Sequence, residues 1–191
     1  MKHFQKKDLW TIPNIICYVR ILLIPVFCYI YMHATKSADY YLACGIVLFS
    51  SFTDLFDGMI ARKFNMVTDL GKILDPVADK LTHAALALCL AFRYPLMRIL
   101  LALMIIKEGY MAIMGIYTMK KGWMLDGAMF FGKVCTALLF SGLFVLFLFP
   151  TMPLTLVNTI ITIMMLSMIY TFVRYIILYH HMLHTAGEHH D

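Results

Sequence analysis

Long apolar runs, broken by short clusters of charged residues and prolines, cover almost the whole chain. A helix needs roughly 20 mostly apolar residues to cross the hydrocarbon core of a bilayer. Six runs approach or reach that length, and proline marks the break between the last two, at Pro150 and Pro153. The pattern predicts six transmembrane helices, over residues 13–33, 40–61, 73–92, 95–118, 129–149 and 153–178. We therefore expect an all-α integral membrane protein, with a single membrane domain over residues 1–191.

Composition excludes the main soluble alternatives. Hydrophobic residues make up 62% of the 191 residues and charged residues only 14%, whereas a soluble domain carries about 25% charged residues. The five cysteines stand singly in apolar runs without a CxxC pair. They therefore predict neither a disulfide framework nor a zinc site.

The two ends are more polar than the spans. Residues 3–12 mix basic and large apolar side chains, which fits an amphipathic helix in the headgroup plane or a basic flank that only orients the first span. Residues 179–191 form a polar, histidine-rich tail, which we expect to be solvated. Lys and Arg favour cytoplasmic loops, and most of them fall on the side of the two termini. We expect both termini, and the acidic segment described next, to face the cytoplasm, in a bacterial plasma membrane.

Residues 52–80 hold five of the eleven acidic residues of the chain. Asp54 and Asp57 are three apart and Asp75 and Asp79 four apart, so each pair shares a helix face. A helical hairpin would gather these four carboxylates, whose mutual repulsion calls for a compensating charge. Hard oxygen ligands suit Mg²⁺, Mn²⁺ or Ca²⁺. The fifth acid, Asp69, fits a solvated loop residue.

Other residues of this segment suit a phosphate-bearing ligand. Gly58 lies inside an expected helix, where glycine costs about 1 kcal/mol against alanine, and its bare backbone would admit a bulky ligand. Arg62 suits phosphate oxygens or serves as an ordinary positive flank. Gly71 suits a turn or a ligand contact.

The full spacing, Asp54-x2-Asp57-Gly58-x2-Ala61-Arg62-x8-Gly71-x3-Asp75-x3-Asp79, resembles the signature of the CDP-alcohol phosphotransferase family. The resemblance implies transfer of a phosphatidyl group from CDP-diacylglycerol to an alcohol, with release of CMP. It implies two divalent ions, Mg²⁺ or Mn²⁺, and a homodimer. By position, the metal ligands are Asp54, Asp57, Asp75 and Asp79, with Asp79 also the general base. The residues that contact the CDP moiety are Asp54, Asp57, Gly58, Arg62, Gly71 and Asp75.

The acceptor alcohol is less closely defined. "TIPNIICYVRILLIPVF" and "LGKILDPVADK" resemble the phosphatidylglycerophosphate synthase and cardiolipin synthase branches, which implies glycerol 3-phosphate first. Lys107 and Lys133 are candidates for its phosphate, since a charge in or beside a span is costly. Lys107 pairing with Glu108, and Lys133 as a helix-end flank, are the alternatives. Phosphatidylglycerol, serine and inositol phosphate stay open as acceptors. An ion transporter would carry acidic residues in several spans, whereas the acidic residues of this chain are concentrated in residues 52–80.

Overall fold

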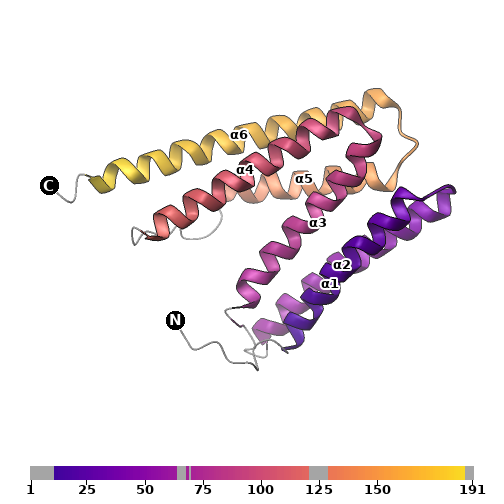
Figure 1. The fold of residues 1–191 in the computed structure, drawn as a ribbon, viewed down its shortest axis with the longest axis horizontal. Helices are drawn as coiled ribbons and strands as arrows, with labels where there is room; N and C mark the ends of the chain where they lie inside the picture. The colour runs from indigo at the N-terminus through magenta and orange to yellow at the C-terminus, as the bar shows by residue number, and fades with distance from the viewer. Residues whose placement is uncertain (1–10, 64–67, 69, 121–128, 188–191) are drawn as a thin grey trace. The chain divides into compact units, whose positions relative to one another are not determined.

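The computed structural model describes residues 11–63, 68, 70–120 and 129–187, and all of their regular structure is helical (Figure 1). The helices are α1 (Ile12–Met32), α2 (Ser37–Lys63), α3 (Gly71–Arg93), α4 (Pro95–Lys120), α5 (Phe130–Leu148) and α6 (Leu154–Gly187). The prediction of six helices in this order is confirmed.

Four of the described helices are long and apolar enough to cross a membrane. They are Pro13–Met32, Pro95–Lys120, Phe130–Leu148 and Leu154–Leu183. Helix α3 carries Lys72, Asp75, Asp79 and Lys80 in its first half and Arg93 at its end. An all-α integral membrane protein is the architecture that these helices build.

The last helix is longer than its apolar run. It was expected to end at residue 178, but α6 continues to Gly187. The apolar pattern marks the part of a helix that meets lipid, whereas a helix ends where the backbone is interrupted. No proline stands between residues 178 and 187, and glycine is the usual residue at a helix C-terminus. Much of the expected polar tail is therefore the last turns of α6.

The chain divides into two compact units, which are described separately. The first holds α1, α2, most of α3 and residues 147–150. Here α1 and α2 pack along each other (Figure 1). Tyr31 stacks on Phe147 with ring centroids 3.9 Å apart and meets Tyr40 edge-on at 5.2 Å. In the first turn of α2, the Asp39 carboxylate accepts hydrogen bonds from the backbone N–H groups of Lys36 and Thr35, which lower the pKa of Asp39.

The second unit holds α4, most of α5, and α6. Helices α4 and α6 lie side by side (Figure 1), joined by an edge-on contact between Tyr110 and Phe172 with centroids 5.4 Å apart. Helix α5 meets α6 at two glycines. A Cβ at Gly132 would overlap the hydroxyl of Tyr175, and one at Gly142 would overlap the sulfur of Met164. Small residues of this kind let two membrane helices approach closely.

Candidate functional site

One face of α1 contacts the aspartates of α3. Asn14, Cys17 and Arg20 are spaced three apart, so they line a single face of the helix, and each is at most 2% exposed. The Sγ–H of Cys17 donates to Oδ1 of Asp75 at 3.2 Å. Nη1 of Arg20 donates to Oδ1 of Asp79 at 2.5 Å, as an ion pair. We call these three residues the α1 stripe.

The two aspartates of α3 contact the α1 stripe and are partly exposed. The prediction that Asp75 and Asp79 share a face of one helix is confirmed, because both are contacted from the same side of α1. Asp75 is partly exposed, and the side chain of Asp79 is 49% exposed. Both carboxylates are thus fixed on one side and accessible from outside the protein.

Gly71 begins α3 beside Asn14 of the α1 stripe. Nδ2 of Asn14 donates to Oγ1 of Thr68 at 3.2 Å, and the same oxygen accepts the backbone N–H of Gly71 at 2.9 Å. A Cβ at Gly71 would lie 2.9 Å from Oδ1 of Asn14. Glycine is therefore required at position 71 because the Asn14 side chain leaves no room for a Cβ. This steric reason adds to the turn or ligand contact predicted from the sequence.

The remaining motif residues lie on α2. Asp54, Asp57, Gly58 and Arg62 fall in its second half, and the spacing of the first two on a continuous helix keeps them on one face. Their side chains lie outside the described residues, as does Asp69. Within the part of the chain that the structure describes, no three acidic, His or Cys side chains gather as a metal cluster. The four-carboxylate metal site therefore stays a prediction.

The two lysines expected to meet an acceptor phosphate lie in the second unit. Nζ of Lys107 donates to Oε1 of Glu108 at 2.9 Å, which is the alternative pairing considered from the sequence. The lysine side chain is 11% exposed and the glutamate 36%. Lys133 is exposed near the start of α5. An acceptor role for either residue stays a prediction.

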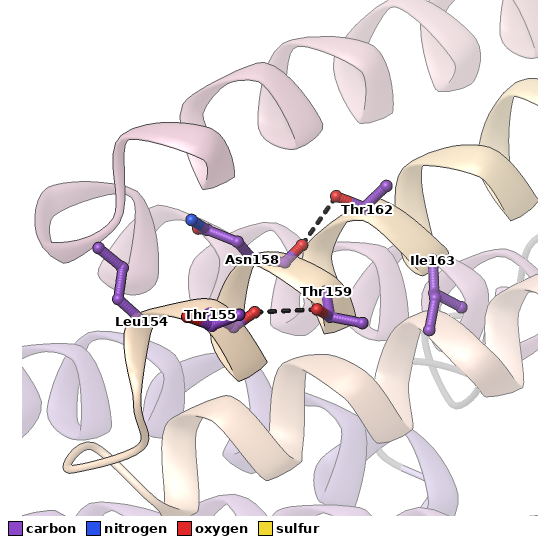
Figure 2. A pocket seen from close by; sticks show the side chains of 6 residues that line it. All are labelled: Leu154, Thr155, Asn158, Thr159, Thr162 and Ile163. Carbon is purple, nitrogen blue, oxygen red and sulfur yellow. Dashed lines mark hydrogen bonds between the residues drawn. The ribbon is translucent and has the colours of Figure 1, made fainter.

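A shallow hollow on α6 is chemically unsuited to the reaction. Figure 2 shows its lining, which is Leu154, Thr155, Asn158, Thr159, Thr162 and Ile163. The Thr159 hydroxyl donates to the carbonyl of Thr155 at 2.9 Å, and the Thr162 hydroxyl to that of Asn158 at 2.8 Å (Figure 2). None of the six lining residues is titratable, so the hollow offers neither a base nor a counter-charge for phosphate.

Comparison with known proteins places the aspartate pattern in a family. A family model described as CDP-alcohol phosphatidyltransferase matches residues 10–186, nearly the whole chain. The chain belongs to this family. The resemblance inferred from the aspartate spacing is therefore confirmed, and the match takes in the α1 stripe as well as the motif.

Family members of two kinds are similar to this chain. It is 42% identical over 89 residues to a cardiolipin synthase (CMP-forming) / mitochondrial hydrolase fusion protein of Schizosaccharomyces pombe, covering 46% of this chain and 14% of that protein. It is 42% identical over 71 residues to the CDP-diacylglycerol--glycerol-3-phosphate 3-phosphatidyltransferase of Rickettsia typhi, covering 37% of this chain and 39% of that protein. It is 37% identical over 109 residues to the cardiolipin synthase (CMP-forming) of Rattus norvegicus, covering 56% of this chain and 34% of that protein. The chain thus matches well under two thirds of the length of each relative.

The structure adds residues that the motif left out. The sequence pattern gave no role to Asn14, Cys17 or Arg20. Cys17 and Arg20 hydrogen-bond to Asp75 and Asp79 of the family signature, and Asn14 hydrogen-bonds to Thr68, which accepts the N–H of Gly71. One signal was available, because an arginine within an apolar span is costly and usually functional. Its partner was not readable, since Arg20 and Asp79 are 59 residues apart in the sequence.

Proposed function

We propose that this protein transfers the phosphatidyl group of CDP-diacylglycerol to glycerol 3-phosphate, giving phosphatidylglycerophosphate and CMP. The observation that carries the proposal is the pair Asp75 and Asp79, held on one face of α3 by the α1 stripe in a chain of this family. A fixed carboxylate that is open on one side meets the first requirement of a general base, which is geometry.

The reaction needs one proton transfer and one displacement at phosphorus. Asp79 accepts the proton of the acceptor hydroxyl, and the hydroxyl oxygen forms a bond to the phosphorus of the phosphatidyl group. The bond from that phosphorus to the oxygen of CMP breaks, and its electron pair leaves with CMP. The proton on Asp79 then passes to solvent, which its half-exposed side chain allows.

The donor set fits a hard divalent cation. Asp75 and Asp79 offer carboxylate oxygens four residues apart on one helix, and the nearby sulfur of Cys17 is engaged as a hydrogen-bond donor to Asp75. Oxygen donors of this kind suit Mg²⁺ or Mn²⁺, and Asp54 and Asp57 would complete the ligand set. When bound, the ions would neutralise the diphosphate and the leaving CMP. Gly58, Arg62 and Gly71 would contact the CDP moiety.

A second acceptor is favoured by one observation. Lys107 is already compensated by Glu108, which weakens it as a binding site for the doubly charged phosphate of glycerol 3-phosphate. Phosphatidylglycerol presents a neutral hydroxyl instead, and two of the similar relatives are cardiolipin synthases. Cardiolipin synthesis is therefore the alternative function, with phosphatidylglycerol as acceptor.

The same proposal includes the setting of the enzyme. Residues 1–191 would act as one membrane domain, with the termini and the aspartates at the cytoplasmic surface because the basic residues gather on that side. CDP-diacylglycerol joins a soluble nucleotide to lipid tails, so its phosphates lie at such a surface. The family resemblance supports a homodimer.

The deciding experiment is an acceptor screen with the purified full-length protein in lipid nanodiscs. CDP-diacylglycerol with a labelled acyl chain is offered with Mg²⁺ or Mn²⁺ and one acceptor at a time: glycerol 3-phosphate, phosphatidylglycerol, serine or inositol phosphate. Thin-layer chromatography identifies the lipid product, and CMP is measured separately. A parallel series with chelator, followed by readdition of either metal, tests the metal requirement.

The expected result is CMP release with phosphatidylglycerophosphate as product, abolished by chelator and restored by metal. Cardiolipin as the product would instead identify phosphatidylglycerol as the acceptor in place of glycerol 3-phosphate. Asp39→Asn is the matched control for Asp79→Asn, because it makes the same change at an acid in the first turn of α2, and it should leave turnover unchanged. The absence of CMP release with every acceptor would refute the transferase proposal.

A further inference from the structure

Arg20 is buried although its partner is not. The arginine side chain is 2% exposed, and that of Asp79 is 49% exposed. Burying a guanidinium is costly unless it is paired and hydrogen-bonded. A purely surface ion pair would leave both side chains in solvent, where it contributes little. The asymmetry means that Arg20 reaches Asp79 from the protein side, while about half of the Asp79 side chain remains exposed.

The chemistry of arginine suits such a role. The guanidinium is planar and always charged, and its donors have a fixed geometry. Arg20 is the last residue of the α1 stripe, and its side chain is almost fully buried while it donates to Asp79. Its direction is therefore decided by helix packing, and the donor Nη1 fixes the direction of Oδ1 of Asp79 in turn.

We propose that Arg20 is a positioning residue for phosphatidyl transfer, which holds the Asp79 carboxylate in the orientation that accepts the proton of the acceptor. This inference rests on the proposed function, because it takes Asp79 as the base. In this role Arg20 acts through Asp79, the residue to which it donates, and need not contact either substrate. The competing role is a structural tie that only joins α1 to α3.

Steady-state kinetics of the full-length protein in nanodiscs separate the two roles. Arg20→Gln removes the charge and shortens the reach to Asp79, so kcat should fall by about 10²-fold, the usual cost of a misplaced reacting group. The KM for CDP-diacylglycerol should change by less than about threefold, since Arg20 does not meet the donor. Arg20→Lys keeps the charge without the planar fork, and it should recover about a tenth or more of wild-type kcat.

Phe27→Leu is the matched control on α1. Phe27 is 1% exposed and packs edge-on against Phe147, so its truncation loosens the same helix without touching an aspartate. It should lower the melting temperature while leaving kcat unchanged below the transition. An Arg20→Gln variant whose kcat is also unchanged would overturn the proposal. So would an Arg20→Lys variant no better than Arg20→Gln, or failure of both Arg20 variants to fold, because these results describe a structural tie.

A thermal double-mutant cycle tests the contact without any assay of turnover. Arg20→Gln, Asp79→Asn and the double variant are melted in the same nanodiscs. A coupled pair predicts that the double variant loses several degrees less than the two single losses combined. Additive losses would overturn the proposal. If the wild-type protein releases no CMP with any acceptor, the proposed function fails, while the cycle still reports on whether Arg20 holds Asp79.

Discussion

Replacing Gly71 by alanine tests the closest approach of α1 to the start of α3. The added Cβ would lie 2.9 Å from Oδ1 of Asn14 and 3.1 Å from Oγ1 of Thr68, and ordinary contacts begin at 3.4 Å. Neither oxygen can move away without breaking other contacts. Asn14 is 1% exposed and donates to Thr68, which in turn accepts the N–H of Gly71. Relief of the overlap must therefore break this hydrogen-bonded set or move α1.

The size of the effect follows from these contacts. A lost hydrogen bond costs about 1 kcal/mol, and an added methyl in a tight site typically costs about 1–3 kcal/mol. Against this, alanine gains at most about 1 kcal/mol of helix propensity over glycine. The steric terms win, and the expected net loss is about 1–3 kcal/mol. At about 2–4 °C per kcal/mol for a chain of this length, the melting temperature should fall by several degrees.

The assay compares melting temperatures in nanodiscs with the same substitution elsewhere. Gly45→Ala is the matched control, because Gly45 lies inside α2 and an added Cβ there meets no atom within 4 Å. It should be neutral or slightly stabilising. Asn14→Ala combined with Gly71→Ala should remove the shorter of the two close contacts, so the double variant should be less destabilised than the two single changes predict. The reasoning fails if Gly71→Ala melts no lower than Gly45→Ala.

Three further predictions follow from single contacts. Asp79→Asn should lower CMP release by about 10²–10⁴-fold, the usual worth of a general base, while binding of labelled CDP-diacylglycerol persists; near-normal turnover would exclude Asp79 as the base. Gly132→Ala should destabilise the protein by about 1–3 kcal/mol, because its Cβ overlaps the Tyr175 hydroxyl, and an unchanged melting temperature would contradict this packing. Glu108→Gln should destabilise the protein by about 1–2 kcal/mol, less than for a fully buried pair because the glutamate is 36% exposed; thermal melting with Lys107→Met as comparison checks it, and equal stability to wild type would argue against the pair.

Helix positions were largely predictable because they depend on local patterns. Apolar runs and proline breaks gave every helix boundary to within three residues, apart from the end of α6. Composition alone excluded a soluble domain. The end of α6 was missed because hydropathy indicates which residues contact lipid, and it does not indicate where a helix ends once it has left the lipid.

The aspartate spacing alone was enough to recognise the family. The spacing from Asp54 to Asp79 identified the family, because a set of carboxylates, a glycine and an arginine at fixed intervals on two helices is meaningful without knowledge of the fold. It also put Asp75 and Asp79 on one helical face, since a separation of four residues is enough for that.

The residues that hold those carboxylates became visible only in the three-dimensional fold. Asn14 meets Thr68, Cys17 meets Asp75 and Arg20 meets Asp79 across 54 to 59 residues of sequence. Periodicity tells which residues share a face of one helix, but the register of two helices is set by how their side chains interlock. The pairing of a buried arginine with an accessible aspartate is a product of that register, and so is the steric requirement for Gly71.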